Sequence, residues 1–179
     1  MNAEVLTPET LNQQGQSVYK AGDYEQAAEI FGKAAESYAA RDDALNAAEM
    51  NNNRSVALLQ AGDAAAALQA AEGTDATFAA GGDPHGQAMA LGNQAAALES
   101  LGRLKESLER YQASSDLLKQ LDDREMRSYV LKRISSLQMR LGHQLESLAA
   151  MDVALDSQPH LTLREKILKK LLGIPFHRS

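Results

Sequence analysis

The sequence has no cysteine and no tryptophan, and aromatic residues make up only 4% of its 179 positions. The lack of cysteine excludes disulfides and thiolate metal sites. Chains without disulfides are typical of the reducing cytosol. We therefore expect a cytoplasmic location. Because aromatic anchors are scarce, the 44% of apolar residues, rich in alanine, is expected to form a core of close helix contacts.

Long apolar runs are also missing. No stretch approaches the roughly 20 apolar residues that cross a bilayer. The first residues, Met1-Asn2-Ala3-Glu4, lack the basic region and apolar block of a secretory signal. A formal net charge of −6 makes general affinity for nucleic acid or anionic lipid unexpected. We expect neither a nucleic-acid partner nor a membrane partner.

The residue patterns of catalytic and metal sites are absent as well. The sequence contains no G-x-S-x-G, no Walker sequence and no G-x-G-x-x-G. The four histidines have no i, i+4 relation and no neighbouring cysteine: His85, His143, His160 and His177. We expect no enzyme activity, no catalytic residue, no metal and no cofactor.

What the sequence does contain is a glycine that returns every 40 residues, at Gly22, Gly62, Gly102 and Gly142. The surrounding stretches read AGDYEQA, AGDAAAA, LGRLKES and LGHQLES. Apolar residues at helical spacing lie on both sides of each glycine. Because a helix that reverses commonly ends on a residue with positive φ, the repeated unit is predicted to be helix, tight turn, helix.

Three further positions of this 40-residue frame hold small residues in every copy. They are Gly15, Ser55, Ala95 and Ser135 before the glycine, then Ala27, Ala67, Ser107 and Ser147, and then Ala34, Thr74, Ser114 and Ala154 after it. Small residues on one helical face let two helix axes approach closely. We expect them at the crossings of each helix pair.

With these residues in place, the chain resembles the tetratricopeptide repeat family, whose second helix carries A-x-x-x-F. Ala27 and Phe31 match this motif fully, Ser107 with Tyr111 and Ser147 with Met151 match it with substitutions, and Ala67 with Ala71 matches it weakly. The 40-residue length is similar to that of the long-repeat adaptors of cell polarity and of kinesin light chains.

The resemblance implies an all-α fold, a right-handed α-solenoid of four helix-turn-helix repeats. Thr7-Pro8-Glu9 gives a helix start, with Thr as the cap and Pro at the first helical position. The predicted organisation is a leader at 1–7, an array at 8–160 (repeats 8–47, 48–87, 88–127 and 128–160), a capping helix at 161–173 and a tail at 174–179.

The links between copies carry aspartates, at Arg41-Asp42-Asp43, Gly82-Asp83-Pro84 and Asp122-Asp123-Arg124. Paired carboxylates could serve acid-base catalysis or calcium, but the spacing is not that of an EF-hand. Aspartate in a short turn usually accepts backbone N–H bonds or caps the next helix. We interpret these aspartates as turn residues.

The last predicted helix is interpreted as a terminal cap with a polar outer face, in which Lys169 would obstruct a following helix. An alternative is that Arg164, Lys166, Lys169 and Lys170 mark a basic helix for a membrane surface or a partner.

Family geometry implies that the first helices line a concave groove, with Gln13, Asn53, Asn93 and Arg133 forming a ladder along it. Amides offer both donors and acceptors, which suits holding the backbone of an extended peptide. Asn52-Asn53-Arg54-Ser55 is similar to the asparagine segment of carboxylate-clamp repeats, a likeness that carries over to Asn53. The basic positions of that clamp are mostly not basic in this chain.

The groove is also predicted to have a polarity, because its cations fall in the fourth copy. Arginine and carboxylate form strong charge-assisted bonds, so the acidic part of a ligand is expected towards repeat four. The alternative is that Lys132 and Arg140 are solvated residues paired with nearby carboxylates. The predicted peptide-binding residues are Asn12, Gln13, Gln16, Asn52, Asn53, Asn93, Tyr129, Lys132, Arg133 and Arg140.

The predicted function is therefore a non-enzymatic scaffold or adaptor that binds an extended segment of a protein or peptide. Two alternatives stay open: a self-association module, or an accessory subunit of a larger complex. A monomer or a weak homodimer is expected.

The second copy is predicted to be the least stable part of the array. Residues 64–71 are nearly all alanine, which buries little area, and Gly73, Gly81 and Gly82 raise the entropy cost of ordering. We expect amide hydrogen exchange, measured by mass spectrometry or NMR, to be faster there than in the third and fourth copies. Equal or slower exchange in the second copy would contradict this.

Overall fold

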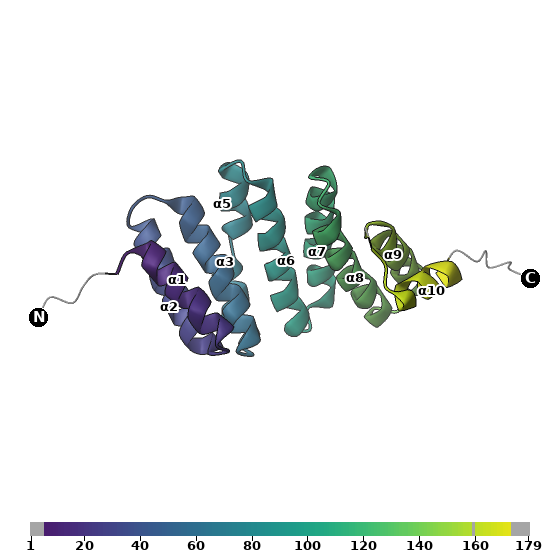
Figure 1. Cartoon of the computed structure of the whole chain (residues 1–179), viewed down its shortest axis with the longest axis horizontal. Coiled ribbons are helices and arrows are strands. Elements are labelled where there is room, and N and C mark those ends of the chain that lie inside the picture. The colour runs from purple at the N-terminus through teal and green to yellow at the C-terminus, as the bar shows by residue number, and fades with distance from the viewer. Residues whose placement is uncertain (1–5, 159, 173–179) are drawn as a thin grey trace, which may run out of the picture.

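The computed structural model describes residues 6–158 and 160–172, which contain ten helices and form an all-α repeat solenoid. The helices lie in one row, with α1 at one end and α10 at the other (Figure 1). Their bounds are α1 (Pro8–Lys20), α2 (Tyr24–Ala39), α3 (Ala44–Gln60), α4 (Ala64–Ala71), α5 (Thr74–Ala80), α6 (Pro84–Ser100), α7 (Leu104–Gln120), α8 (Arg124–Arg140), α9 (Gln144–Asp156) and α10 (Leu163–Leu172). Residues 1–5 of the predicted leader, Gly173 and the predicted tail lie outside the described residues.

Consecutive helices pack against each other, so that α2, for example, contacts both α1 and α3. The short helices α4 and α5 are the exception, since both pack between α3 and α6. The first helices of the four copies are α1, α3, α6 and α8, and the second helices are α2, the pair α4 and α5, α7 and α9. No helix within residues 6–158 and 160–172 combines the length and the apolar character needed to cross a bilayer.

The turns follow a 20-residue period, half of the period seen in the sequence. Left-handed residues recur at Gly22, Asp42, Gly62, Gly82, Gly102, Asp122 and Gly142. The prediction of positive φ at the four repeated glycines is thus confirmed. The links between copies use the same turn, with Asp42 and Asp122 at φ 58° and 51°, since aspartate is among the few residues that tolerate this conformation.

The residue after each left-handed position closes one helix and begins the next. The N–H of Asp23 donates to the carbonyl of Val18 at 3.2 Å, which is the long bond of a Schellman turn. The Asp23 side chain then accepts from the N–H of Gln26. Asp43, Asp63, Asp83 and Asp123 cap the following helices in the same way, so the interpretation of the link aspartates as turn residues is confirmed.

The small residues lie at two crossings in each helix pair, and they are buried as predicted. Several serines at these crossings donate a hydrogen bond to a carbonyl of the opposite helix. Ser107 Oγ donates to the carbonyl of Ala95 at 2.7 Å, and Ser114 Oγ donates to that of Ala88 at 2.8 Å. Ser128 and Ser135 do the same to α9, so serine can replace alanine there without leaving a buried hydroxyl unpaired.

The large core residues form separate clusters at the two ends of the array. One is centred on Phe31 and Tyr38 in copies one and two, and the other on Tyr111 and Leu118 in copies three and four. Between them lies a small cluster of Ala48, Phe78 and Ala90. The core is therefore thinnest at the second copy.

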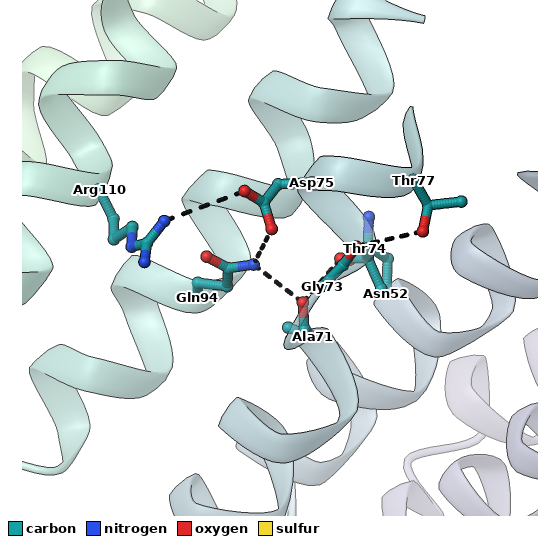
Figure 2. Close-up of polar contacts among 8 residues, drawn as sticks. All are labelled: Asn52, Ala71, Gly73, Thr74, Asp75, Thr77, Gln94 and Arg110. Carbon is teal, nitrogen blue, oxygen red and sulfur yellow. Dashed lines mark hydrogen bonds and ion pairs between the residues drawn. The ribbon is translucent and has the colours of Figure 1, made fainter. Parts of the chain in front are cut away.

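The second helix of copy two is broken, which differs from the single helix predicted there. Gly73 adopts φ 78°, and the helix stops at Ala71 and restarts as α5. The carbonyl of Ala71 accepts from Thr74 Oγ1 at 2.8 Å and from Gln94 Nε2 of α6 at 2.9 Å (Figure 2). Side chains thus replace the backbone donor that a continuous helix would supply.

The terminal helix also departs from its prediction. It begins at Leu163 and has no buried residue. Lys169 forms an ion pair with Asp156 of α9, while Leu163, Ile167 and Leu171 are more than half exposed. The expectation of a polar outer face is wrong, because the apolar side chains of this helix lie largely outside its contact with α9.

Replacing Asp63 with alanine removes the acceptor that holds the N–H of Ala66 at 2.9 Å. We expect Asp63→Ala to lower the free energy of unfolding by about 1 kcal/mol, measured by urea denaturation. Asp63→Ser is the matched control, because serine also caps helices and should leave stability nearly unchanged. Equal losses in both variants would show that the cap bond is not the cause.

Candidate functional site

A recess on the face of the first helices lies between α1 and α3. It has a volume of about 300 Å³, and we call it the α1–α3 notch. It is lined by Gln16, Tyr19, Lys20, Phe31, Asn53 and Val56. The ring of Tyr19 is held edge-on against Tyr24, with centroids 5.2 Å apart.

The notch combines an apolar floor with amides at its edge. Phe31, from α2, closes the bottom and belongs to the core, while Val56 and Tyr19 are half-buried. Gln16 is exposed and Asn53 is half-buried. This arrangement can accept one apolar side chain while the two amides bond to the backbone on either side of it.

Asn12 and Gln13 lie on the same helix as Gln16, and Asn93 is half-buried on α6. Gln16 Nε2 donates to Asn12 Oδ1 at 3.1 Å, which orients both amides along α1. Gln13 is exposed. The structure therefore places all four of these predicted residues on first helices. Asn12 and Gln16 are joined by a hydrogen bond, and Gln16 is the one of the four that lines the α1–α3 notch.

Asn52 does not lie on this face. It is only 7% exposed, and its Oδ1 is 3.0 Å from the hydroxyl of Thr74 on α5. One step along a helix rotates the side chain by about 100°, so that Asn53 faces the notch and Asn52 faces the second helix. The prediction that Asn52 is available to a ligand is at odds with this burial.

The cations of copy four are paired within the chain. Arg133 Nη2 lies 2.6 Å from Glu99 Oε2, and Arg140 Nη1 lies 2.8 Å from Glu99 Oε1. The Glu99 side chain is only 10% exposed, whereas the Arg133 and Arg140 side chains are 41% and 46% exposed. Two cations thus share one carboxylate, and the cluster keeps a net positive charge facing solvent.

Lys132 is occupied in a different way. Its Nζ donates to Glu165 Oε1 of α10 at 2.7 Å, so it ties the terminal helix to the array. For Lys132 and Arg140, the alternative of pairing with nearby carboxylates is the arrangement found. Tyr129, by contrast, is 59% exposed on α8.

The two halves of the face carry different chemistry at equivalent positions. Adding 80 to Tyr19, Phe31 and Asn53 gives Glu99, Tyr111 and Arg133. The position of the α1–α3 notch is therefore taken, two copies later, by the charged cluster. Burial raises the pKa of the Tyr111 hydroxyl, while Arg133 acts in the opposite direction.

Sequence reasoning missed Tyr19, Val56 and Glu99 as residues of this face. Val56 lies three positions after Asn53, and Tyr19 three after Gln16, which is the spacing of one helical face. That signal was available in the sequence. The role of Glu99 depends on residues 34 and 41 positions further on, and no local pattern indicates it.

The structure defines the class of the protein as a helical-repeat solenoid built from paired helices. Within this class its fold is of the tetratricopeptide type, which confirms the resemblance seen in the sequence. No protein-family model matches the chain, and no curated protein matches it by sequence.

Solved structures show the same fold at low sequence identity. A putative kinesin light chain of Podosopora anserina with nearly identical TPR-like repeats has a TM-score of 0.75 at 12% identity, covering 96% of this chain and 87% of the other. BtubC (BKLC) from P. vanneervenii has a TM-score of 0.74 at 14% identity, covering 92% and 70%. MamA from Desulfovibrio magneticus RS-1 has a TM-score of 0.65 at 22% identity, covering 86% and 78%.

Hydrogen bonds lower the pKa of Glu165 to about 2. The bond from Lys132 has the largest effect, and the bonds from the N–H and the hydroxyl of Thr162 add to it. Because the folded pKa is depressed, the contribution of Glu165 is complete above its ordinary value of 4.5 and is lost as pH falls towards 2. We expect the helical Cα chemical shifts of α10 to decline over that interval. In Glu165→Gln they should already be reduced at neutral pH; identical shifts in both proteins would contradict the proposed tie.

Proposed function

We propose that the chain is a non-enzymatic interaction scaffold that binds an extended peptide segment along the face of its first helices. One apolar side chain of the ligand enters the α1–α3 notch. Gln16 and Asn53 bond to the ligand backbone beside it. The observation that carries the proposal is the open notch itself, which has an apolar floor and two amides at its edge, exposed Gln16 and half-buried Asn53.

The direction of the ligand follows from the charged cluster. Arg133 and Arg140 share Glu99, so one positive charge remains uncompensated beside the exposed ring of Tyr129. An acidic part of the ligand is therefore directed towards α8, while its apolar part lies at α1 and α3. Lys132 and Asn52 are left out of this proposal, since Lys132 pairs with Glu165 and Asn52 is buried.

A second candidate function rests on α10. Leu163, the most exposed of its apolar residues at 75%, lies in line with Ile167 and Leu171 along the helix. An exposed apolar stripe of this kind favours self-association, and a mass that rises with concentration would reveal it.

The proposal predicts which peptides a random dodecapeptide phage library yields on the immobilised chain. Enriched peptides should share an apolar residue with acidic residues to one side of it. Val56→Lys fills the notch with a charge, and we expect it to weaken the best enriched peptide by about tenfold or more, measured by isothermal titration calorimetry. Leu145→Lys, an equivalent change on α9, is the matched control and should leave affinity unchanged.

A triple variant tests the proposed direction of the ligand: Glu99→Gln, Arg133→Gln and Arg140→Gln. It removes all three charges of the cluster and leaves no buried charge without a partner. Peptides with acidic residues should bind it more weakly, and their neutral analogues should not. If the library yields no enriched peptide, or if Val56→Lys and Leu145→Lys behave alike, groove binding is wrong.

A further inference from the structure

The break in the second helix of copy two creates a second recess, on the side of the second helices. This cavity of about 220 Å³ lies between α4, α5, α6 and α7, and we call it the break cavity. Its lining includes Gly73 at the break, and it shares no residue with the α1–α3 notch.

Gln94 of α6 lies at the inner end of the break cavity and is only 5% exposed. Its Nε2 donates one hydrogen to the carbonyl of Ala71 at 2.9 Å and the other to Asp75 Oδ1 at 2.8 Å (Figure 2). Both donors are therefore committed, which fixes Oε1 on the side that faces Arg110 in Figure 2. Among the described residues, no donor forms a hydrogen bond with Gln94 Oε1, and this oxygen keeps contact with solvent.

Asp75 presents a second acceptor beside it. Its Oδ1 is held by Gln94, while its Oδ2 lies 3.9 Å from Arg110 Nη1, which is beyond hydrogen-bonding distance. The Asp75 side chain is mostly buried, whereas Arg110 is about half exposed at the rim. The inner end thus offers two acceptors with no donor bonded to either.

The charges of the walls favour a cation. Arg103 is held by Glu106 through two bonds of 2.8 and 2.6 Å, so it is committed. Glu72 and Asp75 add two further carboxylates, and Arg110 adds one further cation. The lining therefore holds three carboxylates against two guanidinium groups. Leu68 and Leu98 supply an apolar surface along the cavity.

We propose that the break cavity binds an arginine side chain of a partner protein. The guanidinium group donates in parallel to Gln94 Oε1 and Asp75 Oδ2 and displaces Arg110, while the aliphatic stem lies on Leu68 and Leu98. Its planar fork suits two adjacent acceptors, which the single point charge of a lysine does not. The site is independent of the proposed groove, so either can fail alone.

The test uses Nα-acetyl-arginine methylamide as the probe and the full chain labelled with ¹⁵N. We expect saturable chemical-shift changes at the Gln94 side-chain amide and at the backbone of residues 73–75. The citrulline analogue, which has the same shape without the charge, should produce none. Asp75→Asn should weaken arginine binding by about fivefold or more, because it removes the charge-assisted bond.

Two further variants fix the interpretation. Arg110→Gln removes the competing internal cation and should strengthen binding of the arginine probe a few fold. Asp116→Asn, which removes an exposed carboxylate elsewhere on α7, is the matched control and should have no effect. If Asp75→Asn fails to fold, the Arg110→Gln variant still decides the question, because the proposal requires its affinity for the arginine probe to rise.

Three results would each overturn the proposal. The first is no saturable change with the arginine probe, or an equal change with citrulline. The second is unchanged or weaker binding in Arg110→Gln. The third is a saturable change with Nα-acetyl-glutamate methylamide at the same residues, which would make the cavity an anion site.

Discussion

The rest of this structure depends on how closely the two helices of each pair cross. Small residues at the crossings bring the backbones together, and the serines among them donate to carbonyls across the contact. An unpaired hydroxyl in such a buried place would cost about 1–3 kcal/mol. Serine is compatible with the crossing only because the opposite carbonyl is within reach, and a larger residue would push the pair apart and shift every later helix of the row.

Because the crossings fix how the helices pack, the residues on the exposed face of the first helices can differ between copies without altering the arrangement of the helices. Asn53 and Arg133 occupy equivalent places two copies apart, yet one borders an open recess and the other belongs to a closed ionic cluster. The same holds on the side of the second helices, where, among the described residues, copy two alone has a left-handed glycine that interrupts its second helix. Because the helix pairs keep the same geometry, differences in sequence between the copies give this chain two recesses with different linings.

Much of the fold could be predicted from the sequence because its determinants are local. A turn glycine with positive φ and a capping aspartate each act within a few residues, and both were predicted correctly. The left-handed Asp42 and Asp122 were not, since aspartate adopts this conformation only in some contexts. The site was harder: Asn52 and Asn53 are neighbours in sequence but lie on different sides of α3, and the pairing of Arg133 with Glu99 joins two copies.

The uneven core has a mechanical consequence. Between the two large clusters, centred on Phe31 and Tyr111, lies the small cluster of Ala48, Phe78 and Ala90. An elastic rod bends most where its cross-section is weakest, so thermal flexing of this solenoid concentrates at the second copy. Such bending would change the separation between Asn53 and Arg133, and with it the length of a segment that could contact both residues at once.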